Sequence, residues 1–156
     1  MKYDDASWHH GGDFPADLPQ EAGGTHIAMF VVWCWAKGMA GALTRDEFPE
    51  ILQAVSSRSD SPGAIFARGS DDKFTDEDLN DEGNAFASAY YGVGGELRDY
   101  VRDYESTLGR GLPSVYHVSD TWEVFDRLEP VIARRFKAWR GKRTNWFEKL
   151  WPWTKQ

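Results

Sequence analysis

The fold is decided by one apolar stretch, His26-Ile27-Ala28-Met29-Phe30-Val31-Val32-Trp33-Cys34-Trp35-Ala36-Lys37. Nearly every residue inside it is apolar, so a helix formed by this stretch must be buried around most of its circumference. Thr25 is placed to cap the start of the helix, and Gly38 and Gly41 are placed to end it. A bilayer span needs about 20 apolar residues, more than this stretch offers. We therefore predict a buried core helix.

Segments on either side of the core helix repeat apolar residues at spacings of three and four, which is typical of amphipathic helices. The predicted helices run from Thr44 to about Ser57, from Pro62 to Arg68, from Thr75 to Tyr90, from Leu97 to Leu108, and from Asp120 past Trp139. Thr44-Arg45-Asp46-Glu47 has the pattern of a capping box, and Pro130 should kink or split the last helix. Residues 1–24 are predicted to be irregular, and Gly111–Val118 has the strongest β character. We predict a mainly α, single compact multi-helix domain with an irregular N-terminal segment and at most one short extended segment.

The length of 156 residues fits one domain, which can bury roughly 68–70% of the surface of its unfolded chain. We expect residues 1–143 to form a globular α domain and residues 144–156 to form a Trp-rich basic tail. Cys34 is the single cysteine, so we expect no intramolecular disulfide and a buried thiol. The N-terminus carries one lysine and then two aspartates, unlike a secretory signal. We expect a cytoplasmic protein without a cofactor.

The net charge of −7 is unevenly distributed. Residues 127–156 hold nine basic and two acidic side chains, a net charge of +7, so residues 1–126 carry −14. The basic cluster from Arg134 to Arg143 also suits the C-terminal end of a helix, where cations favour the macrodipole. An acidic body repels phosphates, so we expect a basic protein partner and no nucleic acid. The candidate contact residues are Asp71, Asp72, Asp76, Glu77, Asp78, Asp81 and Glu82.

The sequence has no nucleophile elbow, no phosphate-binding loop and no cysteine-based zinc pattern, which favours a protein that is not an enzyme. The alternative is a metal-dependent enzyme, because imidazole and carboxylate groups are common ligands of zinc and iron. Its candidate ligands are His9, His10, Asp13 and His26, with His117 as a fifth. The spacing of these residues matches no metal-binding motif, so local packing of the histidines is the competing interpretation.

The C-terminal residues Asn145-Trp146-Phe147-Glu148-Lys149-Leu150-Trp151-Pro152-Trp153 combine aromatic and basic side chains. Tryptophan favours the membrane interface, and lysine and arginine favour anionic lipids. Peripheral attachment to a membrane through this tail is a third hypothesis, beside docking of the tail on the body. The sequence gives no indication of the oligomeric state.

Three blocks of this sequence resemble the signature of one family: Tyr3-Asp4-Asp5-Ala6-Ser7-Trp8-His9-His10-Gly11-Gly12-Asp13-Phe14-Pro15, Phe74-Thr75-Asp76-Glu77-Asp78-Leu79-Asn80-Asp81-Glu82-Gly83-Asn84, and Tyr116-His117-Val118-Ser119-Asp120-Thr121-Trp122. The family is an uncharacterised bacterial domain family of similar length. The resemblance implies no assigned reaction and carries over no catalytic residue. In its compact, acidic character the chain is also similar to immunity proteins, which neutralise toxins in bacterial competition. On that likeness, we expect toxin neutralisation through the acidic face.

Overall fold

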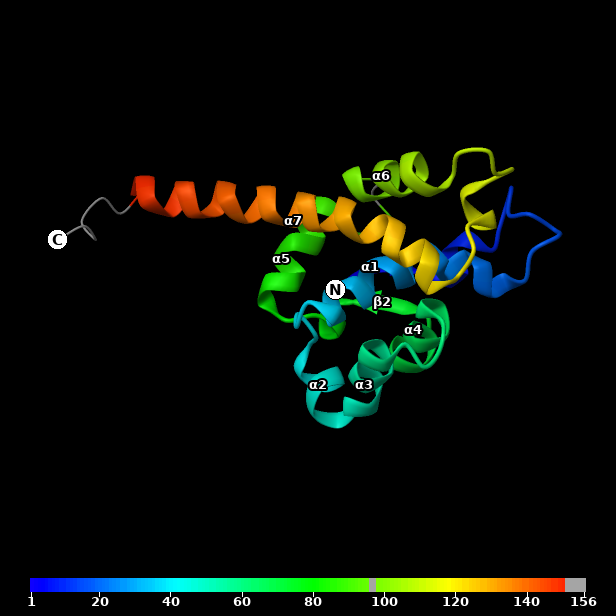
Figure 1. The fold of residues 1–156 in the computed structure, drawn as a ribbon, viewed down its shortest axis with the longest axis horizontal. Helices are drawn as coiled ribbons and strands as arrows, with labels where there is room; N and C mark the ends of the chain where they lie inside the picture. Colours follow the sequence, from blue (N-terminus) through cyan, green and yellow to red (C-terminus); the bar gives the residue numbers. More distant parts are fainter. Residues whose placement is uncertain (96–97, 151–156) are drawn as a thin grey trace.

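The apolar stretch forms helix α1, Thr25–Ala36, at the centre of the molecule (Figure 1). The structure, a computed structural model, describes residues 1–95 and 98–150. Every side chain from Ile27 to Trp35 is buried, which confirms the predicted core helix. The chain then reverses at Gly38, whose φ of +78° is a left-handed conformation that glycine adopts without strain. Burial raises the pKa of the Cys34 thiol, as expected for an unreactive cysteine.

Further helices surround α1 in the described residues: α2 Ala42–Glu47, α3 Pro49–Ser57, α4 Pro62–Ser70, α5 Asp81–Tyr90, α6 Asp99–Leu108 and α7 Trp122–Leu150. Helices α3 and α4 pack on one side of α1, and α7 crosses its other side (Figure 1). Helices α5 and α6 both pack against α7. Short 3-10 helices lie between these elements: η1 Ala6–His9, η2 Gln20–Gly24, η3 Asp76–Asp78 and η4 Val115–His117. The mainly α, single-domain architecture is thereby confirmed.

A small antiparallel sheet joins the N-terminus to the middle of the chain. Strand β1, Lys2–Asp5, pairs with β2, Lys73–Thr75, and a bulge between Lys2 and Asp4 shifts the register. A regular strand would alternate its side chains between two faces, but a bulge disturbs that alternation. Tyr3 and Asp4 are accordingly both buried, although they are neighbours. The Tyr3 ring stacks on Phe74 at 4.5 Å between centroids, which anchors the strand and holds Asp4 in the interior.

The structure corrects three predicted helix starts. Thr44 caps no helix and is buried within α2, while Pro49 begins the separate helix α3. The residue before a proline is disfavoured in α-helical conformation, and Phe48 breaks the helix there with φ −129° and ψ 52°. Thr75 caps the short helix η3 through a capping box with Asp78, and α5 begins only at Asp81. Thr25 is the first residue of α1 rather than its cap.

The sequence placed the extended segment at the wrong position in the chain. Gly111–Val118 contains the 3-10 helix η4, whereas both strands of the described residues lie elsewhere, at β1 and β2. Pairing between distant segments forms the sheet, so local β propensity did not locate it. Helix α7 continues through Pro130 without splitting, and Pro130 is exposed, so water can solvate the carbonyl that proline leaves unpaired. The expected domain boundary at residue 143 falls inside α7, and residues 151–156 lie outside the described residues.

None of the helices in the described part of the chain combines the length and apolarity that crossing a membrane requires.

Close backbone approach at Gly41 provides a test of this packing. The Gly41 N–H donates to the carbonyl oxygen of Asp78 at 2.9 Å, and a Cβ at this position would overlap the carbonyl of Glu77. We expect Gly41→Ala to reduce the free energy of unfolding by about 2–3 kcal/mol, the usual cost of overpacking, in a urea titration. The matched control is Gly141→Ala on α7, where nothing lies within 4 Å of the added Cβ. Equal stability of the two variants would contradict this packing.

Candidate functional site

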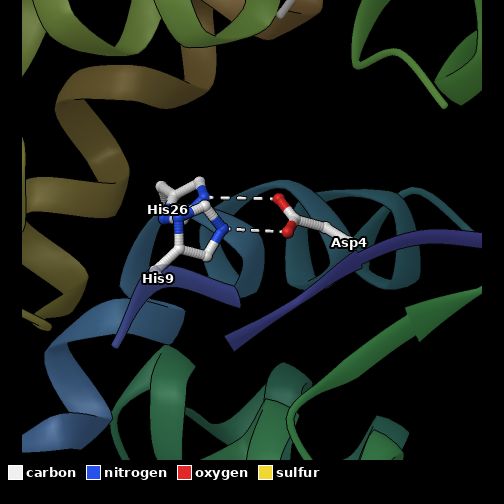
Figure 2. A group of neighbouring side chains, drawn as sticks. All are labelled: Asp4, His9 and His26. Atoms are coloured by element: carbon white, nitrogen blue, oxygen red, sulfur yellow. Dashed lines mark hydrogen bonds and ion pairs between the residues drawn. The ribbon is translucent and has the colours of Figure 1, made fainter. Parts of the chain in front are cut away.

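Three titratable side chains from separate elements meet at one point: Asp4 on β1, His9 at the end of η1, and His26 in the first turn of α1 (Figure 2). One ligand atom from each lies within 4.8 Å of the other two. Within the described residues, this is the one group of three or more histidine, cysteine or carboxylate side chains with that spacing. The bulge in β1 and the start of the buried helix together bring the three groups into contact.

Asp4 is the centre of the cluster. Its Oδ1 accepts hydrogen bonds from the Nε2 of His9 at 2.9 Å and from the backbone N–H of Asp5 at 2.8 Å. Its Oδ2 accepts from the hydroxyl of Tyr91 at 2.6 Å and lies 3.4 Å from the Nε2 of His26. Both imidazoles therefore direct the same ring nitrogen at one carboxylate, as Figure 2 shows.

The electrostatics of the cluster favour an ionised carboxylate beside a neutral imidazole. Burial opposes ionisation of Asp4, but its contacts with the two imidazoles and with Tyr91 outweigh burial and hold its pKa well below the usual value. Burial lowers the pKa of His26 below its usual 6.5, although the Asp4 carboxylate opposes that effect. Neutral His26 then presents its Nε2–H to ionised Asp4. Burial, followed by the nearby Asp4 charge, raises the pKa of Tyr91, which remains a protonated donor.

The cluster lines a cleft of about 420 Å³ between the N-terminal segment and the elements α6 and η4. Most of the remaining wall is aromatic or aliphatic, and includes Trp8, Val101, Val115 and Tyr116. The hydroxyl of Tyr116 lies 3.2 Å from the Nδ1 of His9, so the wall also fixes the orientation of that imidazole. A mostly apolar cleft of this size with a few converging polar groups has the usual composition of a small-molecule site.

The structure brings together only part of the predicted metal-ligand set. His9 and His26 meet, but His10 interacts through its Nε2 with the carbonyl of Gln20, and Asp13 is exposed away from the group. His117 lies elsewhere, with its ring nitrogens at Ser114 and Asp17. The structure therefore does not bring His10, Asp13 and His117 into one group with His9 and His26. The sequence did not identify Asp4 as a candidate metal ligand. A carboxylate five residues before a histidine is a weak sign of a metal site, and the contact between Asp4 and His26 depends on the fold.

The predicted acidic contact residues differ in their accessibility. Asp78 is only 7% exposed and accepts hydrogen bonds from the Thr75 N–H and the Ser70 hydroxyl, so it caps η3 and does not offer a surface charge. Ion pairs join Asp71 to Lys73, Asp76 to the N-terminal amine and Glu82 to Arg140. Asp72 is half-buried, and its pKa is raised by burial and by neighbouring Asp71 and Glu21. Glu77 and Asp81 are exposed.

A family model for a domain of unknown function, DUF7832, matches residues 2–118. The chain belongs to this family. This match is consistent with the expected membership of an uncharacterised domain family. The matched range contains Asp4, His9, His26 and the elements from β1 to η4. Helix α7 follows the matched range. Searches of curated proteins and of solved structures found no match.

The lowered pKa values give the metal-free DUF7832 protein a defined acid sensitivity. The unfolded chain takes up a proton at His26 near 6.5 and at Asp4 near 3.8, whereas the folded protein takes up both at lower pH. The unfolded state therefore binds more protons, and stability should fall as the pH drops through 6.5 and again below 3.8. Urea unfolding at about pH 7 and about pH 5 measures the first loss. We expect His26→Gln to remove most of that loss, and an unchanged pH dependence in this variant would contradict the assignment.

Proposed function

We propose that this protein is a metal-dependent enzyme, with Asp4, His9 and His26 holding a divalent transition-metal ion at the wall of the cleft. The observation that carries the proposal is the convergence of these three ligand atoms within 4.8 Å. Two imidazoles and one carboxylate, with a further position open to a cleft, form the ligand set of catalytic zinc sites and of non-haem iron sites. Hydrolysis is the proposed reaction, because a metal-bound water is deprotonated near neutral pH.

The two donor distances at Asp4 are compatible with such an ion. Metal–ligand bonds of about 2.0–2.2 Å allow donors to lie no more than about 4.4 Å apart, and about 3.4 Å apart in a tetrahedron. The Asp4 oxygens lie 2.9 Å from His9 Nε2 and 3.4 Å from His26 Nε2. A metal ligand needs a deprotonated Nε2, so the His9 proton would then reside on Nδ1 and be donated to Tyr116. Tyr91 would still donate to Asp4, which holds the carboxylate in place.

The walls of the cleft support a small substrate with an apolar group. Trp8, Val101 and Tyr116 would contact that group, while the cluster would face a hydrolysable carbonyl. Tyr104 also lines the cleft, and its buried hydroxyl has no hydrogen-bond partner among the described residues. Burial raises the pKa of Tyr104, so the phenol keeps its proton as a donor. We propose an ester or amide of a small apolar acid as the substrate class.

Metal content and isothermal titration with Zn²⁺ or Fe²⁺ test the proposal. Loss of a residue that only hydrogen-bonds to a metal ligand typically reduces metal affinity about 10–100-fold. Replacing a residue that binds the metal directly should therefore reduce the affinity at least about 100-fold. We expect that loss in Asp4→Asn, His9→Ala and His26→Ala. The matched controls are His10→Ala, adjacent to His9, and His117→Ala, and both should bind metal like the wild type.

Two results would contradict the metal proposal. One is that the folded wild-type protein binds neither ion. The other is binding that His10→Ala or His117→Ala weakens as much as His9→Ala does. In either case, the Asp4 cluster would be a structural hydrogen-bond network that ties β1 to α1.

A second candidate function is binding of a basic protein, as in an immunity protein that neutralises a bacterial toxin. The observation that favours it is a groove of about 480 Å³ between α2 and η3, lined by Leu43, Glu77 and Asp81. Leu43 and neighbouring Phe48 are large apolar side chains that are 49% and 44% exposed. Exposed apolar groups beside acidic ones suit an interface with a cationic protein, in which charge steers the encounter.

A pull-down at low salt tests this second candidate, with the product of the neighbouring gene as the probe. The variant Asp71→Lys/Glu77→Lys/Asp81→Lys reverses three exposed charges, and we expect it to weaken capture at least about tenfold through slower association. The matched control reverses three acids on another surface: Asp13→Lys/Asp17→Lys/Glu105→Lys. Capture that both variants retain, or that both lose equally, would rule out a specific role for the acidic face.

A further inference from the structure

A serine, a histidine and an aspartate form a hydrogen-bonded chain outside the Asp4 cluster. The Oγ of Ser114 lies 2.9 Å from the Nδ1 of His117, and the Nε2 of His117 lies 3.0 Å from an Oδ of Asp17. Ser114 caps η4 and His117 is its last residue, whereas Asp17 precedes His117 by 100 residues. The order of contacts is that of a nucleophile, a base and a group that orients the base.

The partners of each atom fix the direction of these hydrogen bonds. The N–H of Tyr116 donates to the Ser114 Oγ at 3.2 Å, so the hydroxyl keeps its own proton to donate to His117. The contact with His117 lowers the pKa of Asp17, whose ionised carboxylate can only accept. In a neutral imidazole, the proton is therefore on Nε2 and the lone pair is on Nδ1. The two nitrogens have exchanged places relative to serine proteases, but either can act as base when the other donates to a carboxylate.

The surroundings leave room for a reacting molecule beside the base. Ser114 is half-buried, and the His117 side chain is 16% exposed. His117 also lines a cavity of about 480 Å³, whose apolar wall includes Leu18 and Val118. The carboxylates that line this cavity are Glu21, Asp72 and Asp120, and no lysine or arginine lines it. An anionic molecule would be repelled there, so an uncharged one is favoured.

A backbone donor is available next to the serine. The N–H of Val115, the residue after Ser114, has no acceptor among the described residues. In α/β-hydrolases, the N–H of the residue after the nucleophilic serine binds the oxyanion of the tetrahedral intermediate. The Val115 N–H is in the corresponding position of the sequence, and it is free to take the same role.

We propose that Ser114 is an acyl-accepting nucleophile, with His117 as its general base, Asp17 as the positioning residue and uncharged esters of small acids as the substrate class. The Ser114 Oγ bonds to the carbonyl carbon while its proton moves to Nδ1 of His117. His117 gives this proton to the leaving oxygen as the C–O bond breaks, which releases an alcohol and leaves an acyl ester on Ser114. Water then attacks the acyl ester with His117 as base, which releases the acid and restores the serine hydroxyl.

Labelling of the full chain with a fluorophosphonate tests the nucleophile, because this uncharged probe phosphonylates activated serines. Mass spectrometry should locate the label at Ser114, and Ser114→Ala should abolish it. A general base contributes about 10²–10⁴-fold, so His117→Ala should slow labelling at least about 100-fold, and added imidazole should restore part of the rate. Asp17→Asn should slow labelling by a smaller factor, because water reaches this 71% exposed carboxylate and can replace it. Asp17→Glu should react faster than Asp17→Asn.

The matched control is Ser106→Ala, since Ser106 is exposed and its hydroxyl donates to the carbonyl of Asp103 rather than to a histidine. This variant should be labelled, and should hydrolyse p-nitrophenyl acetate, like the wild type. The nucleophile is wrong if the wild type takes up no label, if the label maps to another residue, or if His117→Ala reacts at the wild-type rate. Ser114 would then only cap η4. Mapping on the wild type decides the question even where a variant does not fold.

The chemistry at Ser114 uses no residue of the Asp4 cluster. Removal of metal with a chelator should therefore leave the rate of labelling unchanged. Failure of the nucleophile and failure of the metal site are thus distinguishable.

Discussion

Burial of α1 on all sides is the constraint from which the rest of the structure follows. A helix with no polar face cannot border water, so other elements must cover each of its faces. Helices α3 and α4 cover one side, α7 covers another, and aromatic rings fill the space around Phe30. In the first turn of α1, His26 is not fully buried, and its side chain remains 12% exposed. The cleft forms at this partly covered end.

The same constraint explains why the candidate site combines segments that are distant in sequence. The Tyr3 ring must pack beside Phe74 to cover the core, and this contact holds β1 against β2. The bulge then turns Asp4 inward, where a carboxylate is stable only with several hydrogen-bond donors. His9, Tyr91 and the Asp5 N–H supply them, and His26 lies next to the second oxygen. A metal ion would replace part of this network with stronger bonds to the same atoms. The candidate site lies within the DUF7832 range, whereas helix α7 follows that range.

The sequence by itself determined the core helix, the mainly α fold, the buried cysteine and the start of α4 at Pro62, because these depend on local periodicity, apolarity and proline geometry. It also identified two of the three cluster residues, His9 and His26, as candidate ligands. Only the tertiary structure decided that Asp4 joins them and that His10, Asp13 and His117 do not. The strands and the burial of Asp78 were likewise settled by long-range packing. Contacts between distant segments depend on how the whole chain covers α1, and no short stretch of sequence contains that information.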